Sequence, residues 1–513
     1  MCLEGTRIEF LDDIVQWINS YESEARALLV SGGAGTGKSS VMHTIGGRFK
    51  ALGRLGSMFC FSDAEKTTRT PASLFPHISR DLADLDESIR FELCKAVENM
   101  SDRTTVSITA QFDNLLLKPA NAIRQSLHGP IVIIIDALDE CGTGEGRRKL
   151  LEVLSSRLKE LPPSFRIIIS SRPDHDIRAK LRGEDILIKT MDSIPIRSTA
   201  NDIAMYVKKE LSHETDINDT MHQSLASHAR GLFQWANVAC NYILEHGLGE
   251  TASSRYEELI HPLTTSDGGD ITGNTLLDYL YEAVLSKVLT TRNGEAVNTF
   301  KFVMGRVLTA FEPLSCKSLN QLFQVSNGTP KNCKAENVVM YLGSLLSGVD
   351  DQDTPIRPLH TSFRDFLVNS RRSGKFFVPS DTTDVHSDMA LASLSIMKQE
   401  LRFNICQLPT SYLANKDIPG IEELVAENIS PDLSYACQFW GAHVSSLSAT
   451  NLPPMTRIKV TKDIHKVLSR RVLYMLEVLS LLGASESGLR QFRHVYSWMK
   501  VCTLYNHVPP LTS

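Results

Sequence analysis

Apolar residues follow two different patterns along the chain, and the change between them divides it into two parts. The first part contains five short apolar runs separated by stretches with a helical period, at residues 27–30, 56–61, 131–135, 166–170 and 186–189. Continuous runs of this kind are typical of parallel strands that are buried on both faces of a sheet. They predict a doubly wound α/β domain over residues 26–192, preceded by an approach segment with a short helix over residues 1–25.

After about residue 196 the strand pattern fades and helical periods take over. Residues 198–211 predict a helix, for which Ser198 or Thr199 is a candidate cap. Residues 247–273 are rich in Gly, Ser and Thr, so they predict a linker. Further helical patterns occupy residues 220–246, 275–289, 297–308 and 471–482. The second part of the chain is therefore expected to be mainly α-helical.

Size and composition limit the classes of protein to consider. A chain of 513 residues is too long for one core, and 42% apolar with 22% charged residues is an ordinary globular composition. The 54 basic and 59 acidic residues give a net charge of −5, which disfavours a general nucleic-acid partner. Ten scattered cysteines without a C-x-x-C pair favour reduced thiols in the cytosol or nucleus. The N-terminus has no signal-peptide pattern, and no apolar run approaches the ~20 residues that a membrane span needs. We therefore expect a cytoplasmic protein without a membrane span.

The strongest chemical signal lies between the first predicted strand and the helix that follows it. Residues 32–39 fit G-x-x-x-x-G-K-[ST] at every fixed position. Glycines let the backbone N–H groups surround phosphate oxygens, and the positive end of the next helix attracts anions. Lys38 is predicted to reach the β- and γ-phosphates, and the Ser39 hydroxyl to ligate Mg²⁺. The predicted nucleotide-binding residues of this loop are Gly32, Gly33, Ala34, Gly35, Thr36, Gly37, Lys38, Ser39 and Ser40.

A second signal follows the apolar run at residues 131–135. The run ends in Asp136, which is therefore expected at the carboxyl edge of the sheet, where it can hold Mg²⁺ through water. Asp139 and Glu140 follow one turn later as the candidate catalytic pair, because they could polarise an attacking water. The alternative is a plain acidic turn at the surface. A further predicted strand lies between Lys38 and Asp136, so we expect Asp136 on a strand that is not adjacent to the loop strand.

Three later features carry weaker signals. Arg172 follows the run at residues 166–170 and could bind the γ-phosphate, although a solvated arginine beside a capping serine is the alternative. The aromatic stretch at residues 231–236 could contact the base or fill a helix interface. His360 precedes an amphipathic helical pattern, and by itself it indicates a structural histidine.

In this order, the motifs resemble the NACHT branch of the signal-transduction ATPases, in the form found in fungal NLR-like proteins and nephrocystin-3-like N-terminal regions. A small residue, Ala137, after Asp136, with an acidic pair beyond Leu138, is the NACHT form, whereas an AAA+ ATPase would carry glutamate directly after Asp136. The matching segments are CLEGTR at 2–7, SGGAGTGKS at 31–39, IIIDALDE at 133–140, IIISSRPD at 167–174, GLFQWA at 231–236, FEPLS at 311–315, LHTSFRDFL at 359–367, HSDMALASLSIM at 386–397, LRFNIC at 401–406, YACQFW at 435–440 and LYMLEVLSLL at 473–482.

The resemblance implies a signalling switch that ADP closes and ATP opens, with slow ATP hydrolysis, Mg²⁺ as cofactor, a homo-oligomer in the ATP state and protein partners of unknown identity. His360 matches the family's winged-helix histidine, which contacts the β-phosphate of ADP, and this reverses the structural interpretation of that residue. Phe233 stands where related switches carry a proline. The implied domains are the nucleotide-binding domain at 26–192, a helical domain at 196–262, a winged helix at 275–375 and a helical region at 385–512.

Two other functions remain open from the sequence. One is a turnover ATPase of the AAA+ type, which would hydrolyse ATP rapidly to do mechanical work. The other is a degenerate scaffold that keeps the fold and binds no nucleotide. The intact Lys38, Ser39, Asp136 and Arg172 argue against the scaffold.

Overall fold

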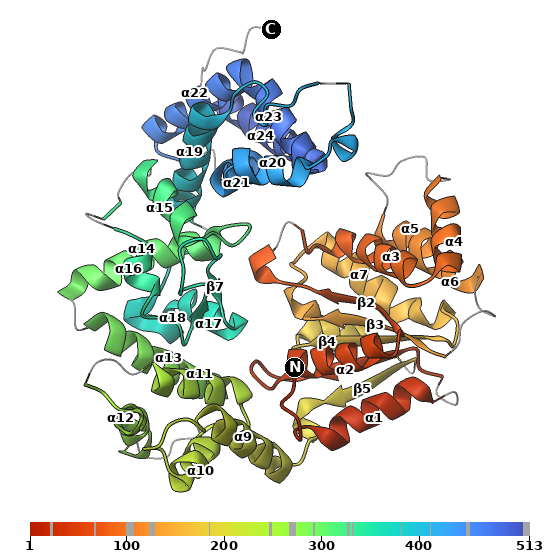
Figure 1. Ribbon diagram of the computed structural model, residues 1–513, viewed down its shortest axis with the longest axis vertical. Coiled ribbons are helices and arrows are strands. Elements are labelled where there is room, and N and C mark those ends of the chain that lie inside the picture. Colours follow the sequence, from red (N-terminus) through yellow and green to blue (C-terminus); the bar gives the residue numbers. More distant parts are fainter. Residues whose placement is uncertain are drawn as a thin grey trace. The chain divides into compact units, whose positions relative to one another are not determined.

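The chain forms two compact units in a computed structural model. One unit comprises Met1–Val284 with His360–Ser362, and the other comprises Leu285–Leu359 with Phe363–Ser513. Figure 1 shows the elements of each unit in chain order. The residues that the structure describes are 1–20, 24–65, 68–98, 107–122, 129–183, 185–245, 249–265, 273–290, 293–325, 329–330, 333–380, 382–410, 412–447 and 452–505.

A five-stranded, fully parallel sheet lies at the centre of the first unit, in the order β2-β3-β4-β1-β5. Its strands are β1 (Ala27–Ser31), β2 (Leu55–Cys60), β3 (Ile131–Asp136), β4 (Phe165–Ser171) and β5 (Ile186–Thr190). All five predicted strands are present, so the α/β class is confirmed. Because β4 lies between β1 and β3, the prediction that Asp136 is on a strand not adjacent to the loop strand is also confirmed.

Helices cover both faces of this sheet (Figure 1). Side chains alternate between the faces, so Leu28 and Val30 belong to one core cluster and Leu29 to the other. The first cluster includes α1 (Ile8–Asn19) and α2 (Lys38–Ala51). The second cluster includes α3 (Leu74–Leu85), α4 (Glu87–Glu98), α5 (Ile108–Phe112), α6 (Lys118–Ala122), α7 (Glu145–Ser156) and α8 (His175–Lys180). Burial on both faces explains why the central strands are continuously apolar.

The first unit continues after the sheet with helices. They are α9 (Ile196–Glu210), α10 (Asp219–His228), α11 (Phe233–Leu244), α12 (Ala252–Thr265) and α13 (Gly273–Thr290), the last of which runs into the second unit. The helix predicted over residues 198–211 corresponds to α9, but the predicted cap is wrong. The helix already begins at Ile196, after Pro195. Thr199 is buried, and its hydroxyl accepts a hydrogen bond from Arg7 Nη1 at 2.9 Å.

The linker predicted over residues 247–273 is wrong in part, because α12 lies within it. Thr251 and Ser254 exchange hydrogen bonds at its start: each side-chain oxygen accepts from the other residue's backbone N–H, at 3.0 and 3.1 Å. This reciprocal pattern begins a helix. The hydroxyl residues that suggested a linker therefore have a capping role here, while residues 247–248 and 266–272 lie outside the described residues.

The second unit is mainly helical. A small antiparallel pair, β6 (Leu346–Ser347) with β7 (Arg357–Pro358), accompanies the helices and was not predicted. Its helices are α14 (Asn293–Thr309), α15 (Cys316–Val325), α16 (Glu336–Val339), α17 (Thr361–Leu367), α18 (Ser370–Ser373), α19 (Thr383–Glu400), α20 (Ile421–Asn428), α21 (Pro431–Ser445), α22 (Pro454–Arg470), α23 (Val472–Leu481) and α24 (Ser485–Tyr505). Among the helices that the structure describes, none combines the length and apolar character of a membrane span.

A chain of buried polar groups crosses the core of the second unit between α19 and α21. The Phe311 backbone N–H donates to the Tyr435 hydroxyl at 3.2 Å, and that hydroxyl lies 2.8 Å from His443 Nε2. His443 Nδ1 lies 3.0 Å from His386 Nδ1. The Tyr435 hydroxyl therefore links the Phe311 backbone to the His443 ring inside the core. The network holds two buried histidines in one arrangement.

Candidate functional site

The predicted phosphate loop joins β1 to the first turn of α2. Gly35 and Gly37 have positive φ angles of 77° and 93°, which side chains rarely allow. A Cβ on Gly35 would also lie 2.7 Å from the Cβ of Gln234, so this position admits only glycine. Thr36 Oγ1 donates to the Gly33 carbonyl at 2.9 Å, which closes the loop on itself. The loop therefore turns tightly at its glycines and is closed by its own side chain.

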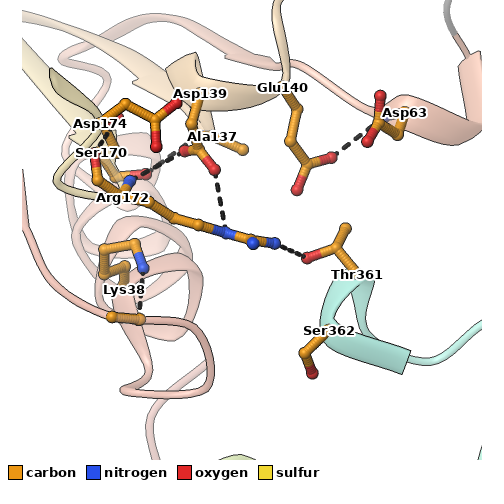
Figure 2. A network of polar contacts seen from close by, with 12 residues as sticks. Lys38, Asp63, Ala137, Asp139, Glu140, Ser170, Arg172, Asp174, Thr361 and Ser362 are labelled. Atoms are coloured by element: carbon orange, nitrogen blue, oxygen red, sulfur yellow. Dashed lines mark hydrogen bonds and ion pairs between the residues drawn. The ribbon is translucent and has the colours of Figure 1, made fainter. Parts of the chain in front are cut away.

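Lys38 begins α2 and turns its ammonium group back over the loop. Nζ donates to the carbonyl oxygens of Gly32 and Gly33, both at 2.8 Å (Figure 2). Burial lowers the pKa of Lys38, and the neighbouring Asp139 opposes that shift. Ser39 lies beside Lys38 in the same first turn of the helix. A phosphate anion near this ammonium would supply the charge partner that neutral carbonyls do not.

Asp136 ends β3 and is almost fully buried, with 1% of its surface exposed. Ser170 of β4 donates a hydrogen bond to its carboxylate, and Cys60 Sγ lies 3.7 Å from its other oxygen. The Ser170 oxygen also accepts the backbone N–H of Ala137 at 3.0 Å. Ser170 thereby fixes both Asp136 and the turn that follows it, a role that the sequence reasoning missed.

Asp139 and Arg172 form one hydrogen-bonded unit across the ends of β3 and β4 (Figure 2). The backbone N–H of Arg172 donates to Asp139 Oδ1 at 3.0 Å, and Arg172 Nε lies 3.1 Å from Asp139 Oδ2. Arg172 Nη2 then donates to the Thr361 hydroxyl at 2.6 Å. Both Asp139 oxygens are engaged with Arg172, so we assign Asp139 to orienting the arginine rather than to activating water.

Glu140 differs from Asp139 in its surroundings. Its carboxylate accepts the backbone N–H of Asp63 at 3.1 Å and points along a separate direction from the arginine in Figure 2. Burial raises the pKa of Glu140 to about 7. A carboxyl group with this pKa is suited to exchange a proton near neutrality. Of the two predicted catalytic residues, Glu140 has the environment of a general base.

Arg7 connects the loop to the helices that follow the sheet, a role that its place in the predicted approach segment and in the CLEGTR match does not indicate. The Arg7 side chain is buried, with Nη2 3.4 Å from the Thr36 carbonyl and Nη1 bonded to Thr199. Its backbone N–H donates to Asp202 Oδ2 at 3.1 Å, and its guanidinium carbon lies 5.0 Å from the centre of the Phe233 ring. The CLEGTR segment thus contributes directly to the loop's support.

The aromatic stretch at residues 231–236 also reaches the loop. The backbone N–H of Gln234 donates to the Gly35 carbonyl at 3.1 Å. Trp235 is fully buried in the helical core, while Phe233 packs beneath Arg7. These contacts agree with the helix-interface interpretation of the stretch.

His360 lies immediately before α17, in the segment grouped with the first unit. Its Nδ1 accepts the backbone N–H of Ser362 at 3.1 Å and lies 2.6 Å from the Ser362 hydroxyl. That hydroxyl is also 2.7 Å from the hydroxyl of Tyr281. Since Nδ1 accepts, neutral His360 carries its ring proton on Nε2. The next residue, Thr361, accepts a hydrogen bond from Arg172, so the chain neighbour of His360 contacts the arginine that we predicted to bind the γ-phosphate.

The donor set fits a nucleoside phosphate with Mg²⁺. Lys38 supplies a buried ammonium, and the amino end of α2 supplies backbone N–H groups. Asp136 is a buried carboxylate that receives neutral donors, and no cation within the described ranges forms an ion pair with it. Carboxylate and hydroxyl oxygens are the ligands that Mg²⁺ prefers, so Asp136 and Ser39 are suited to hold it.

Comparison with known proteins places this site in a family context. Residues 5–172 match the family described as Nephrocystin 3, N-terminal. Over 386 residues, 71% of this chain, the sequence is 24% identical to the vegetative incompatibility protein HET-E-1 of Podospora anserina. The resemblance to NACHT-type, fungal NLR-like proteins is confirmed. The match to HET-E-1 spans 26% of that protein's length, so the chain corresponds to about a quarter of this relative.

Solved structures show more distant likeness. A chain of the Drosophila ORC bound to DNA is 13% identical, with 66% of this chain and 81% of that chain covered and a TM-score of 0.29. Cdc6p from Pyrobaculum aerophilum is 12% identical, with coverages of 69% and 90% and a TM-score of 0.31. Scores of this size do not establish a shared architecture, so the fold class of this chain rests on its own sheet.

Proposed function

We propose that this NACHT-type chain is an ATP- and ADP-binding signalling switch, closed with ADP and open with ATP, that hydrolyses ATP slowly. One observation carries the proposal. The ammonium of Lys38, the buried Asp136 and the Asp139–Arg172 pair converge on loops at one edge of the sheet. Such an edge is where parallel α/β sheets bind their ligands.

Each residue has a distinct role in this proposal. The loop N–H groups and Lys38 bind the phosphates, and Arg172 distinguishes ATP from ADP by contacting the γ-phosphate. Ser39 and Asp136 hold Mg²⁺, which supplies charge neutralisation when bound. Glu140 accepts a proton from the attacking water.

The contact between Arg172 and Thr361 supports switching as well as binding. A γ-phosphate would compete with Thr361 and Asp139 for the same guanidinium, because all three are hydrogen-bond acceptors for one group. Binding of ATP can shift the equilibrium only through such a difference between the two states. His360 is proposed to favour the ADP state by contacting the β-phosphate. The surrounding winged helix at 275–375, the helical domain at 196–262 and the helical region at 385–512 are proposed with it.

Two consequences concern the assembly and its location. We propose that the ATP state forms a homo-oligomer and binds protein partners through it. The ten free cysteines fit a reducing compartment, for which we propose the cytoplasm.

Nucleotide extraction from the purified protein tests the proposal. The protein is denatured, the released nucleotide is quantified, and turnover is measured with added Mg²⁺ and ATP. We expect ADP in near-stoichiometric amount and turnover slower than about 10⁻² per second, as for other nucleotide switches. Rapid turnover would support the AAA+-like ATPase instead. A protein that contains no nucleotide and binds none when it is added would support the degenerate scaffold.

A further inference from the structure

Arg147 is a buried arginine near the start of α7, outside every motif that the sequence reasoning singled out. Only 8% of its surface is exposed. Its Nε and Nη2 donate to the two carboxylate oxygens of Asp176 at 2.7 and 2.9 Å, and Nη2 also donates to Asp174 at 3.0 Å. Its Nη1 donates to the carbonyl of Asp139 at 2.7 Å and lies 3.4 Å from that of Gly142. The guanidinium therefore uses all three of its nitrogens.

These partners come from two separate loops. Asp139 and Gly142 belong to the loop after β3, whereas Asp174 and Asp176 belong to the segment after β4. The first loop contains one short 3-10 turn, Leu138–Glu140, and has positive φ angles at Ala137, Gly142 and Gly144 on either side of it. Side chains from other elements add to its support: Ser170 accepts the Ala137 N–H, and Arg147 donates to the Asp139 and Gly142 carbonyls.

The same two loops carry the candidate chemistry. Asp139, held by its carbonyl, presents both carboxylate oxygens to Arg172, and Glu140 is the next residue. A displacement of the Asp139 backbone would move all three groups together. Displacements of about 1 Å can change a reaction rate by about a hundredfold.

We propose that Arg147 is a positioning residue that holds the Asp139–Arg172 pair in register for recognition of the γ-phosphate. This role rests on the proposed function, and it requires no contact between Arg147 and the nucleotide. Hydrogen bonding to Asp176 raises the pKa of Arg147, so the guanidinium stays charged throughout the pH range in which the protein is folded.

The same domain offers a matched control. Arg157 bonds both carboxylate oxygens of Glu160 at 2.7 and 2.6 Å and lies 2.7 Å from Asp113. It has the same chemistry as Arg147, with two carboxylate partners, but these partners lie on neither of the two loops. A purely stabilising role would lower the melting temperature of both variants, more for the deeper Arg147, and would leave nucleotide affinity unchanged in both.

The experiment compares Arg147→Met, Arg147→Lys and Arg157→Met with the parent protein. Affinities for fluorescent ATP and ADP analogues, the single-turnover rate of ATP hydrolysis and the melting temperature are measured for each. For Arg147→Met we expect ATP affinity to fall about fivefold relative to ADP affinity and hydrolysis to slow about tenfold or more. Arg147→Lys should give intermediate values, because one ammonium cannot reach both loops with the same geometry. Arg157→Met should change only the melting temperature.

Several outcomes would overturn this role. A folded Arg147→Met protein with the parent's affinity ratio and rate excludes positioning, as does a loss that Arg157→Met reproduces. If Arg147→Met does not fold, Asp176→Asn removes one charged partner from an exposed position and should shift the ratio in the same direction; an unchanged ratio there contradicts the proposal. A parent protein that binds neither nucleotide overturns the proposed function, and the positioning role with it.

Discussion

The two units bury polar groups in different ways. In the first unit, buried or half-buried polar side chains gather on loops at one edge of the sheet, where Ser170 bonds Asp136 and Arg147 bonds the Asp139 carbonyl. In the second unit, Tyr435, His443 and His386 lie between helices inside the core. Both sets are hydrogen-bonded, so burial alone does not distinguish a site from a structural network. The distinguishing feature is that the first set borders the loop at residues 32–39, which we propose binds phosphate, and variants in the two sets should therefore affect different properties.

The largest effect is expected for Lys38→Ala. The variant removes the ammonium from the phosphate loop, and two lost charge-assisted hydrogen bonds correspond to at least about a hundredfold weaker ATP binding. Binding of a fluorescent ATP analogue measures it. Lys50→Ala, at an exposed position on the same helix, is the control and should bind like the parent. If Lys38→Ala bound ATP with nearly the parent's affinity, residues 32–39 would not be a phosphate-binding loop.

The corresponding change in the second unit is Tyr435→Phe. It leaves the Phe311 N–H and His443 Nε2 without their shared partner in the core, at a cost of about 2–3 kcal/mol in unfolding free energy. Nucleotide affinity should stay unchanged, which chemical denaturation and ATP binding assays on the same sample can verify. Tyr412→Phe, at a side chain that is 95% exposed, should be neutral. A change in ATP affinity for Tyr435→Phe would contradict the distinction between the polar groups at the sheet edge and the polar network in the second unit.

Glu140→Gln should separate stability from hydrolysis. The folded protein raises the pKa of Glu140 from 4.5 to about 7, so it binds a proton that the unfolded chain releases between these values. Stability is therefore lost as the pH rises from about 4.5 to 7, by roughly 1–3 kcal/mol for this half-buried group.

Glutamine cannot lose that proton. We expect Glu140→Gln to melt higher than the parent at pH 8, to melt like it at pH 4, and to bind ATP normally while hydrolysing it more slowly. Asp139→Asn is the comparison variant, because it should weaken the hydrogen bonds that Asp139 makes with Arg172. Parent-like single-turnover hydrolysis by Glu140→Gln would assign the base elsewhere.

His360→Ala should weaken ADP binding about tenfold more than ATP binding, as expected for loss of one charge-assisted hydrogen bond to the β-phosphate. The structure gives this histidine a second role, because Nδ1 caps the backbone N–H of Ser362. His360→Asn keeps an acceptor for that N–H and removes the imidazole. If His360→Asn restores the parent's ADP-to-ATP ratio, capping alone explains the residue.

The smallest effect is expected for Ala137→Gly. Ala137 has a φ of 53°, a left-handed conformation that costs an L-residue free energy and that glycine adopts readily. The variant should gain about 0.5–1 kcal/mol in unfolding free energy without a change in nucleotide affinity. Ala120→Gly, within the helix α6, is the opposite control and should destabilise.

The sequence predicted the elements whose signals are local. Five strands were identified because their residues are buried on both faces, and the phosphate loop because its spacing is fixed by its own backbone. Arg147 and Arg7 carry no such signal: their partners lie up to 29 and 195 residues away, so only the folded chain brings them together. The predictions of a cap at Thr199 and of a linker across Thr251 were wrong for a related reason. A hydroxyl can cap a helix, bond a distant arginine or belong to a linker, and tertiary contacts select among these uses.

The position of Arg7 has a consequence for the order of events during synthesis. Its backbone partner, Asp202, emerges 195 residues later, which is roughly 10–40 seconds of translation. Shortly before Asp202 emerges, all five strands of the sheet have been synthesised. The Arg7 guanidinium, which contacts the Thr36 carbonyl, still lacks its partner Thr199 in α9. The nascent α/β domain therefore passes through a stage in which its phosphate loop is complete in sequence and incomplete in support. We therefore expect the nucleotide binding that we propose to begin on the ribosome only once α9 has been made.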